Sequence, residues 1–209
     1  MYTLYYKAGA CSLAVHVLLR ELDLAFELEP SKDASGDISP KLARIHPRGS
    51  VPVLQDSGFV LKEGGAILSW LCDEYDSPLL PRAGESRATA LQWLMFANAT
   101  LHPAYGQVFM IDAQAIDQSS KNALLNVISA KIQRLWDEVE TQLEQGDYIC
   151  GEAMSVADIL LSVIANWAPM MPIEISYGPR CKAMFKRVSA RPAYQAALEA
   201  ESIEYQAAA

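Results

Sequence analysis

The pattern of apolar and polar residues changes character about 80 residues into the chain. Before that point, short apolar runs alternate with helix-like spacing, which predicts a β-α-β unit followed by an α-β-β-α unit. Asp56-Ser57-Gly58, which separates two of these runs, is typical of a hairpin turn. In chain order the expected elements are a strand over 2–6, a helix over 12–22, a strand over 26–28, a helix over 40–45, strands over 51–55 and 59–62, and a helix over 64–75.

Beyond these elements, Pro78 and Pro81 break the pattern, and everything after Gly84 is helical or connecting. The expected helices cover residues 86–111, 119–145, 155–168, 179–189 and 192–201. We therefore expect two domains, an N-terminal α/β domain over residues 1–78 and an all-helical domain over residues 85–209.

The helix expected over residues 155–168 is apolar nearly all round and should be the buried spine of the second domain. It begins with Ser155-Val156-Ala157-Asp158, a capping box in which the Ser155 hydroxyl and the Asp158 carboxylate each satisfy a backbone N–H. Because unsatisfied buried amides cost about 1–3 kcal/mol each, we interpret this pair as structural.

Composition and charge exclude several classes of protein. With 51% hydrophobic and 20% charged residues, the 209-residue chain has the composition of an ordinary globular protein. A formal net charge of −8 provides no general attraction for nucleic acid or for an anionic membrane surface, so we expect neither partner. No segment approaches the roughly 18 apolar residues of a membrane span, and the first residues lack the features of a signal peptide, so we expect a cytoplasmic protein.

The four cysteines are too far apart in sequence for a metal knuckle, and no histidine lies at zinc-ligand spacing. We therefore expect neither a metal site nor a disulfide scaffold. They are Cys11, Cys72, Cys150 and Cys181.

Cys11 is the first candidate for chemistry because it lies at the turn between the first strand and the first helix. Unpaired amides and the helix dipole stabilise a negative sulfur there, so we expect a thiol that ionises near neutral pH. Ala14 stands where a resolving cysteine of a thioredoxin-type redox turn would be, which leaves a monothiol site. Such a site suits a mixed disulfide with a small thiol, or holds that thiol beside an electrophile. A small packed cysteine is the alternative interpretation.

Two further segments have the chemistry to bind a peptide-like ligand. A cis bond between Val51 and Pro52 would turn the Val51 backbone toward the helix that Cys11 begins, where its N–H and C=O could pair with an extended chain. Glu63 and Gly64 open the next helix, where free amides suit a carboxylate and Glu63 suits an ammonium group. An ordinary trans proline and a simple helix cap are the alternatives.

His102 is the only one of the three histidines that we expect to face the first domain. It lies late in the first long helix of the second domain, and Pro103 should kink that helix and turn side chains toward a cleft. We interpret His16 as a partner of helix packing and His46 as a loop residue. A merely structural role for His102 is the alternative.

Six segments occur together in the order and spacing of one protein family. They are residues 5–14, His46-Pro47-Arg48-Gly49-Ser50-Val51-Pro52, Glu63-Gly64-Gly65-Ala66-Ile67, Leu101-His102, Cys150-Gly151 with the Ser155–Asp158 box, and Arg191-Pro192. Over its whole length the chain resembles a cytosolic glutathione transferase, and more narrowly the bacterial beta class.

The resemblance implies a thioredoxin-like domain joined to an all-helical domain, a homodimer, and glutathione as co-substrate in the cleft between the domains. It implies that Cys11 contacts the glutathione sulfur, that Val51 pairs with the cysteinyl backbone, and that Glu63 holds the γ-glutamyl end. A family histidine near the sulfur aligns with His102. The implied catalytic residues are Cys11 and His102, and the implied glutathione-binding residues are Cys11, Ser12, Val51, Pro52, Glu63, Gly64 and His102.

Several positions depart from the family pattern, among them Ala8, where the family has proline, and a shorter loop over residues 29–39 that lacks a matched lysine able to touch glutathione. His46 stands where the family usually has asparagine, and Met95 stands where related proteins often place asparagine toward the neighbouring subunit's ligand.

Our leading hypothesis is a detoxification enzyme that conjugates glutathione to a small hydrophobic electrophile or carries out glutathione-dependent thiol–disulfide exchange through Cys11. The second substrate would lie against an apolar surface of the helical domain, although core packing explains the same side chains. These are Phe96, Tyr105, Phe109 and Trp167. The alternative is a non-catalytic ligand carrier or docking protein with the same fold.

Overall fold

The computed structural model describes residues 1–208 and divides them into two compact units. The first, which we call the sheet unit, joins Met1–Arg82 with Ala190–Glu204. The second, the helical unit, joins Ala83–Ser189 with the chain from Tyr205 onward. The helix α9 (Pro192–Glu201) packs along α1 and therefore belongs to the sheet unit, whereas the sequence pattern alone grouped it with the helical domain.

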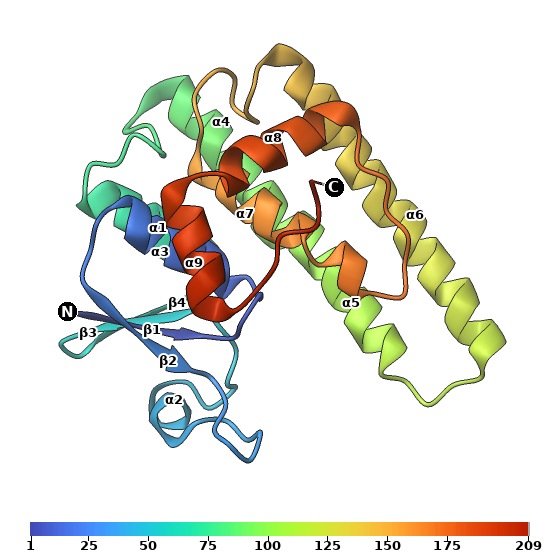
Figure 1. Cartoon of the computed structure of the whole chain (residues 1–209), viewed down its shortest axis with the longest axis horizontal. Helices are drawn as coiled ribbons and strands as arrows, with labels where there is room; N and C mark the ends of the chain where they lie inside the picture. Colours follow the sequence, from blue (N-terminus) through green and yellow to red (C-terminus); the bar gives the residue numbers. More distant parts are fainter. Residues whose placement is uncertain (209) are drawn as a thin grey trace. The chain divides into compact units, whose positions relative to one another are not determined.

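The sheet unit is built on four strands in the order β2-β1-β3-β4. β1 and β2 are parallel, whereas β1 and β3, and β3 and β4, are antiparallel. α1, α3 and α9 cover one face of this sheet, and the short α2 lies on the other (Figure 1). The elements are β1 (Tyr2–Tyr6), α1 (Ser12–Glu21), β2 (Phe26–Pro30), α2 (Pro40–Ile45), β3 (Val53–Asp56), β4 (Phe59–Lys62) and α3 (Gly64–Glu74).

This mixed sheet with flanking helices is the predicted thioredoxin-like arrangement, in the predicted element order. β3 begins at Val53, two residues later than expected. Pro52 explains the delay because it has no N–H to donate to a β ladder. The Val51–Pro52 peptide bond is cis.

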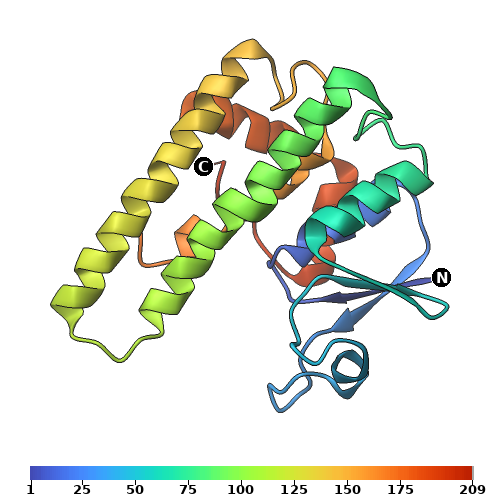
Figure 2. The ribbon, with the colours of Figure 1, turned by 180° about the vertical axis from the view of Figure 1, so that it is seen from behind.

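The helical unit confirms the predicted all-helical character of the second part of the chain. Its long α5 and α6 run side by side in opposite directions and are joined by a short loop (Figure 2). The elements are α4 (Gly84–Met95), the π-helical segment η1 (Phe96–Leu101), α5 (His102–Asp112), α6 (Gln118–Gln142), the 3₁₀ turns η2 (Leu143–Gln145) and η3 (Ala168–Met170), α7 (Val156–Ala165) and α8 (Pro179–Ser189).

The helix expected over residues 86–111 is interrupted, but the interruption precedes His102 rather than following it. Pro103 is in the first turn of α5, where its missing N–H is tolerated, and the preceding turn widens into a π-helix. His102 is therefore the first residue of α5, directly after the π-helical turn.

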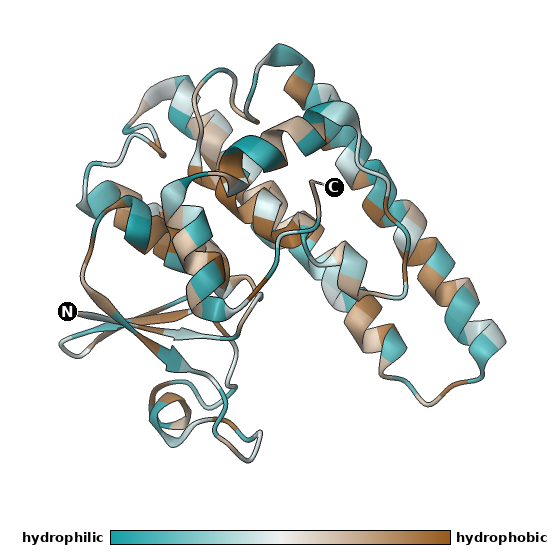
Figure 3. Ribbon diagram, viewed as in Figure 1, coloured by the Kyte–Doolittle hydropathy of each residue, from teal (hydrophilic) through white to brown (hydrophobic). Residues whose placement is uncertain are grey.

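The predicted buried spine is α7, in which every residue is buried. Its apolar colouring stands out between α4 and α8, the helices against which it packs (Figure 3). The capping box is confirmed: the Asp158 carboxylate accepts hydrogen bonds from the Ser155 N–H at 2.8 Å and the Ser155 hydroxyl at 2.7 Å. It also accepts one from the Ile149 N–H at 2.7 Å, so the same carboxylate holds the segment before the helix.

Candidate active site

Cys11 is the N-cap residue of α1, as the sequence predicts. Its thiol donates a hydrogen bond to the Val51 carbonyl at 3.2 Å, which brings two of the predicted site residues into contact. The loop before it is tightly turned, with the Ala10 N–H donating to the Lys7 carbonyl at 3.0 Å. The monothiol and the segment before β3 therefore form one small site within the sheet unit.

The expectation that Cys11 ionises near neutral pH is wrong. Burial raises the pKa of the Cys11 thiol to about 11, and the nearby Glu63 carboxylate adds to that increase. The backbone N–H groups of Cys11 and Ser12 lower the pKa, as the helix-dipole argument requires, but they are outweighed. Cys11 is thus a neutral S–H donor at pH 7.

The Val51 backbone presents one occupied and one open hydrogen-bonding group. Its carbonyl accepts the Cys11 thiol, whereas its N–H has no partner among residues 1–208. An extended peptide that pairs with Val51 in an antiparallel manner uses both the N–H and the carbonyl of that residue. The Cys11 thiol can rotate and donate its proton to another acceptor. Val51 is therefore poised to pair with a peptide-like ligand that displaces or accepts the Cys11 S–H.

Glu63 caps α3 in a backbone conformation that is uncommon for a residue with a side chain. Its φ is +69°, a conformation that costs about 1–3 kcal/mol and persists only where the surrounding structure holds it. The Glu63 side chain is 72% exposed and lies 3.6 Å from the Arg48 guanidinium. Gly64 and Gly65 begin α3 beside it, and their N–H groups lie in the first turn, where a helix has no acceptor of its own for them.

Ser12, counted above with the glutathione-binding residues, is fully buried. Its hydroxyl donates to the Lys7 carbonyl and accepts from the Lys7 N–H, both at 3.2 Å. Both hydrogen bonds close the loop that carries Cys11, so the Ser12 side chain shapes that loop from within the protein.

The same loop is held by a residue that the sequence analysis did not single out. Glu201, at the end of α9, is buried and accepts a hydrogen bond from the Gly9 N–H at 2.9 Å. Its other carboxylate oxygen lies 2.8 Å from Nδ1 of His16 in α1. No local pattern joins residues 185 positions apart, so only the fold reveals this contact.

His102 lies in the helical unit with its ring 4.9 Å from that of Trp167, in an edge-to-face arrangement. Burial lowers the pKa of His102 below its ordinary value of 6.5. The imidazole is therefore neutral at pH 7, and one ring nitrogen carries a proton that can be donated.

The four aromatic residues expected to face a second substrate do not share one environment. Tyr105 and Trp167 are buried and pack edge-to-face at 5.8 Å, Phe96 is half-buried, and Phe109 is 56% exposed. The Tyr105 hydroxyl accepts from the Trp136 indole N–H at 2.9 Å, so it belongs to a buried polar chain. Of the four, Phe96 and Phe109 present accessible apolar surface.

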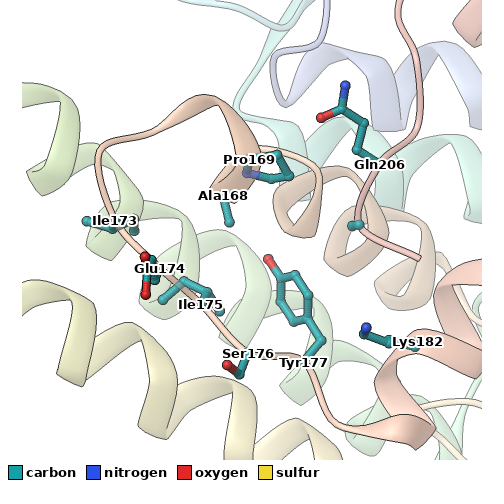
Figure 4. A pocket seen from close by; sticks show the side chains of 10 residues that line it. Ala168, Pro169, Ile173, Glu174, Ile175, Ser176, Tyr177, Lys182 and Gln206 are labelled. Atoms are coloured by element: carbon teal, nitrogen blue, oxygen red, sulfur yellow. The ribbon is translucent and has the colours of Figure 1, made fainter. Parts of the chain in front are cut away.

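A separate pocket of about 540 Å³ lies within the helical unit, where the Tyr177 ring projects toward Ala168 and Pro169 (Figure 4). The Tyr177 hydroxyl proton already has an acceptor within the protein, because it is donated to the Ala165 carbonyl at 2.7 Å. The pocket is lined by Ala168, Pro169, Ile173, Glu174, Ile175, Ser176, Tyr177, Lys182, Gln206 and Ala207. None of the four aromatic residues named above is among them.

No group of three or more histidine, cysteine, aspartate or glutamate side chains is arranged to hold a metal ion over residues 1–208. Within the same range, no helix has the length and apolar character needed to cross a membrane.

Comparison with family models decides the identity of the chain. A model of the glutathione S-transferase N-terminal domain matches residues 8–74, and a model of the C-terminal domain of that family matches residues 99–192. The chain belongs to the glutathione S-transferase family. It is an enzyme of the transferase class that uses glutathione as its co-substrate, which confirms the resemblance given above.

Individual relatives of this transferase match along almost its whole length. A glutathione S-transferase of Xanthomonas campestris is 33% identical, over 96% of this chain and 98% of its own. The crystal structure of a glutathione transferase from Methylococcus capsulatus is 36% identical with a TM-score of 0.83, covering 97% of this chain and 99% of its own. A beta-class transferase of Sphingomonas chungbukensis is 30% identical with a TM-score of 0.80, covering 97% and 100%. The transferase is thus similar to bacterial beta-class enzymes in sequence and in fold.

Proposed function

We propose that this transferase binds glutathione on the sheet unit and conjugates it to a small hydrophobic electrophile. The γ-glutamyl end binds at Glu63 and Gly64, and the cysteinyl backbone pairs with Val51, next to Pro52. The Cys11 thiol then contacts the glutathione sulfur. The contact that carries the proposal is the 3.2 Å hydrogen bond from the Cys11 thiol to the Val51 carbonyl, because it joins the sulfur site to the backbone site.

In this proposal Cys11 acts as a hydrogen-bond donor rather than as a nucleophile. A thiol with a pKa of about 11 is ionised in only about one molecule in 10,000 at pH 7, since each pKa unit is a factor of ten. Its S–H instead turns from the Val51 carbonyl to the glutathione sulfur and stabilises the glutathione thiolate. Thiol–disulfide exchange through Cys11 is the slower activity of the same site.

The conjugation step then needs only glutathione, the electrophile, these donors and water as the proton acceptor. The glutathione S–H proton passes to water, the sulfur forms a bond to the electrophilic carbon, and the leaving group departs with its electron pair. We assign His102 the role of a second neutral donor to the sulfur, in agreement with its lowered pKa. The Ser12 side chain has no direct contact with glutathione in this scheme, because its hydroxyl is committed to Lys7.

The wider setting of the enzyme is also part of the proposal. We assign it to the cytoplasm, to the removal of reactive electrophiles, and to a homodimer. No observation favours the alternative of a non-catalytic carrier.

The proposal is tested by glutathione binding measured calorimetrically, followed by initial rates with an aryl halide. We expect the wild-type protein to bind glutathione and to conjugate it, and Cys11→Ala to keep binding but to lose most of the rate. Cys150→Ala is the matched control because it removes another partly buried free thiol. Absence of glutathione binding by the wild-type protein would overturn the proposal.

A further inference from the structure

His46 is a buried histidine that the proposed chemistry does not use. Its exposed fraction is 4%, and its Nε2 lies 2.7 Å from the Ser50 hydroxyl oxygen. Its backbone joins the same turn, since its N–H donates to the Leu42 carbonyl at 2.7 Å and its carbonyl accepts the Gly49 N–H at 2.9 Å. His46 therefore connects the end of α2 to the residue directly before Val51.

The turn that His46 closes has little freedom to take another form. Gly49 adopts a φ of +67°, which only glycine adopts readily. A Cβ atom on Gly49 would lie 2.6 Å from the Ile38 Cδ1, so the backbone approaches Ile38 closely. Ser50 itself is exposed, and the buried imidazole is the side-chain anchor that the structure gives it.

We propose that His46 is a positioning residue of the glutathione site, which holds Ser50 so that the Val51 N–H and carbonyl face the ligand. This inference rests on the proposed function, because Val51 must pair with glutathione for its position to matter. The Val51 carbonyl is already the acceptor of the Cys11 thiol, one residue beyond the Ser50 anchor. Loosening Ser50 therefore shifts the backbone groups that bind the tripeptide and leaves Glu63 and Gly64 in place.

The surroundings of His46 make this role sensitive to pH. Burial lowers the pKa of His46 below 6.5, and two cations act in the same direction, Lys62 of β4 and Arg48 of its own turn, while Glu63 opposes them. Above pH 6.5 the imidazole is neutral and keeps its buried place. Below its pKa a proton brings charge into a buried position beside two cations, which favours an open turn. Glutathione binding therefore weakens as the pH falls.

The test compares wild type, His46→Asn and His46→Ala, with glutathione affinity measured by calorimetry between about pH 5.5 and pH 7.5, the range over which a histidine titrates. Asparagine keeps a hydrogen-bonding side chain and removes the titration. We expect wild type to lose affinity about threefold or more on acidification. His46→Asn should show a markedly smaller loss. His46→Ala should bind about tenfold more weakly at every pH, with kcat at saturating glutathione within about twofold of wild type.

His102 and Asp158 also titrate in or near this range, but both are present in all three proteins. The difference between wild type and variant in how glutathione affinity changes with pH therefore reports on His46. Ser50→Ala keeps the experiment informative if His46→Ala folds poorly, since it removes the same hydrogen bond from an exposed side chain. An equal pH slope in wild type and His46→Asn, or unchanged affinity in both His46→Ala and Ser50→Ala, would overturn the inference. Failure of wild type to bind glutathione at any pH would instead overturn the proposed function.

Discussion

The Glu201 carboxylate accepts a hydrogen bond from the Gly9 N–H at 2.9 Å, two residues before Cys11. Its second oxygen meets Nδ1 of His16, and Nε2 of His16 accepts from the Arg20 guanidinium at 2.9 Å. Because arginine can only donate, the imidazole must carry its proton on Nδ1 and donate it to Glu201. The last helix of the sheet unit thus holds the loop that carries Cys11 through the Glu201 carboxylate, which accepts hydrogen bonds from both Gly9 and His16.

Glu201→Ala should therefore destabilise the protein. The substitution removes the carboxylate that accepts from the Gly9 N–H and from the His16 Nδ1–H, at about 1–3 kcal/mol for each lost hydrogen bond. Glu201→Gln, which keeps one acceptor oxygen, should lose about half as much. Urea unfolding followed by circular dichroism measures both free energies. A loss below about 0.5 kcal/mol in Glu201→Ala, the range of ordinary surface substitutions, contradicts this interpretation.

Cys11 should react as a thiol of high pKa. Its alkylation rate by iodoacetamide should rise about tenfold per pH unit from pH 7 to pH 9, because only the thiolate reacts and the pKa is about 11. Formation of a mixed disulfide from oxidised glutathione should follow the same trend and disappear in Cys11→Ala, as seen by mass spectrometry of the intact protein. A rate that is already independent of pH near pH 7 shows that the thiol is ionised there, contrary to the structure.

His102 should affect the rate more than the binding of glutathione. A hydrogen bond to a charged acceptor contributes about 1.5–3 kcal/mol, so His102→Phe should lower kcat about 10- to 100-fold while the KM for glutathione changes little. Phenylalanine preserves the ring packing on Trp167, which lies 4.9 Å away, and thereby separates the donor from its packing role. Steady-state kinetics with an aryl halide give both constants. Unchanged kcat in His102→Phe assigns this histidine to packing alone.

The Asp158 capping box should be a large contributor to stability. Asp158→Ala removes the acceptor of three hydrogen bonds, from the Ile149 N–H and from the N–H and hydroxyl of Ser155. We expect a loss of about 2–5 kcal/mol in chemical unfolding, because buried donors are left unpaired. Ser155→Ala should cost about 0.5–2 kcal/mol, as a single cap does. Equal losses in the two variants argue against the additional bond to Ile149.

Local sequence signals predicted much of the fold because they act over a few residues. Three helices were predicted with the bounds that the structure gives them, over 40–45, 179–189 and 192–201, and each begins with proline, which is favoured in a first helical turn. The hairpin turn at Asp56-Ser57-Gly58 and the capping box of α7 are equally local. The sequence pattern put the helix interruption after His102, whereas the π-helical turn precedes this residue. Pro103 indicates that the helix is disturbed nearby, but not on which side of the proline.

By itself, then, the sequence determined the order of the elements, the resemblance to glutathione transferases, and the placement of Cys11 at the start of a helix. Only the tertiary structure decided whether that thiol ionises, because desolvation depends on every element packed around the sulfur and here outweighs the helix amides. It also decided that Glu201 and His16 meet, and that His46 is buried against Ser50. Burial and long-range contact are properties of the packed chain, and no short segment contains them.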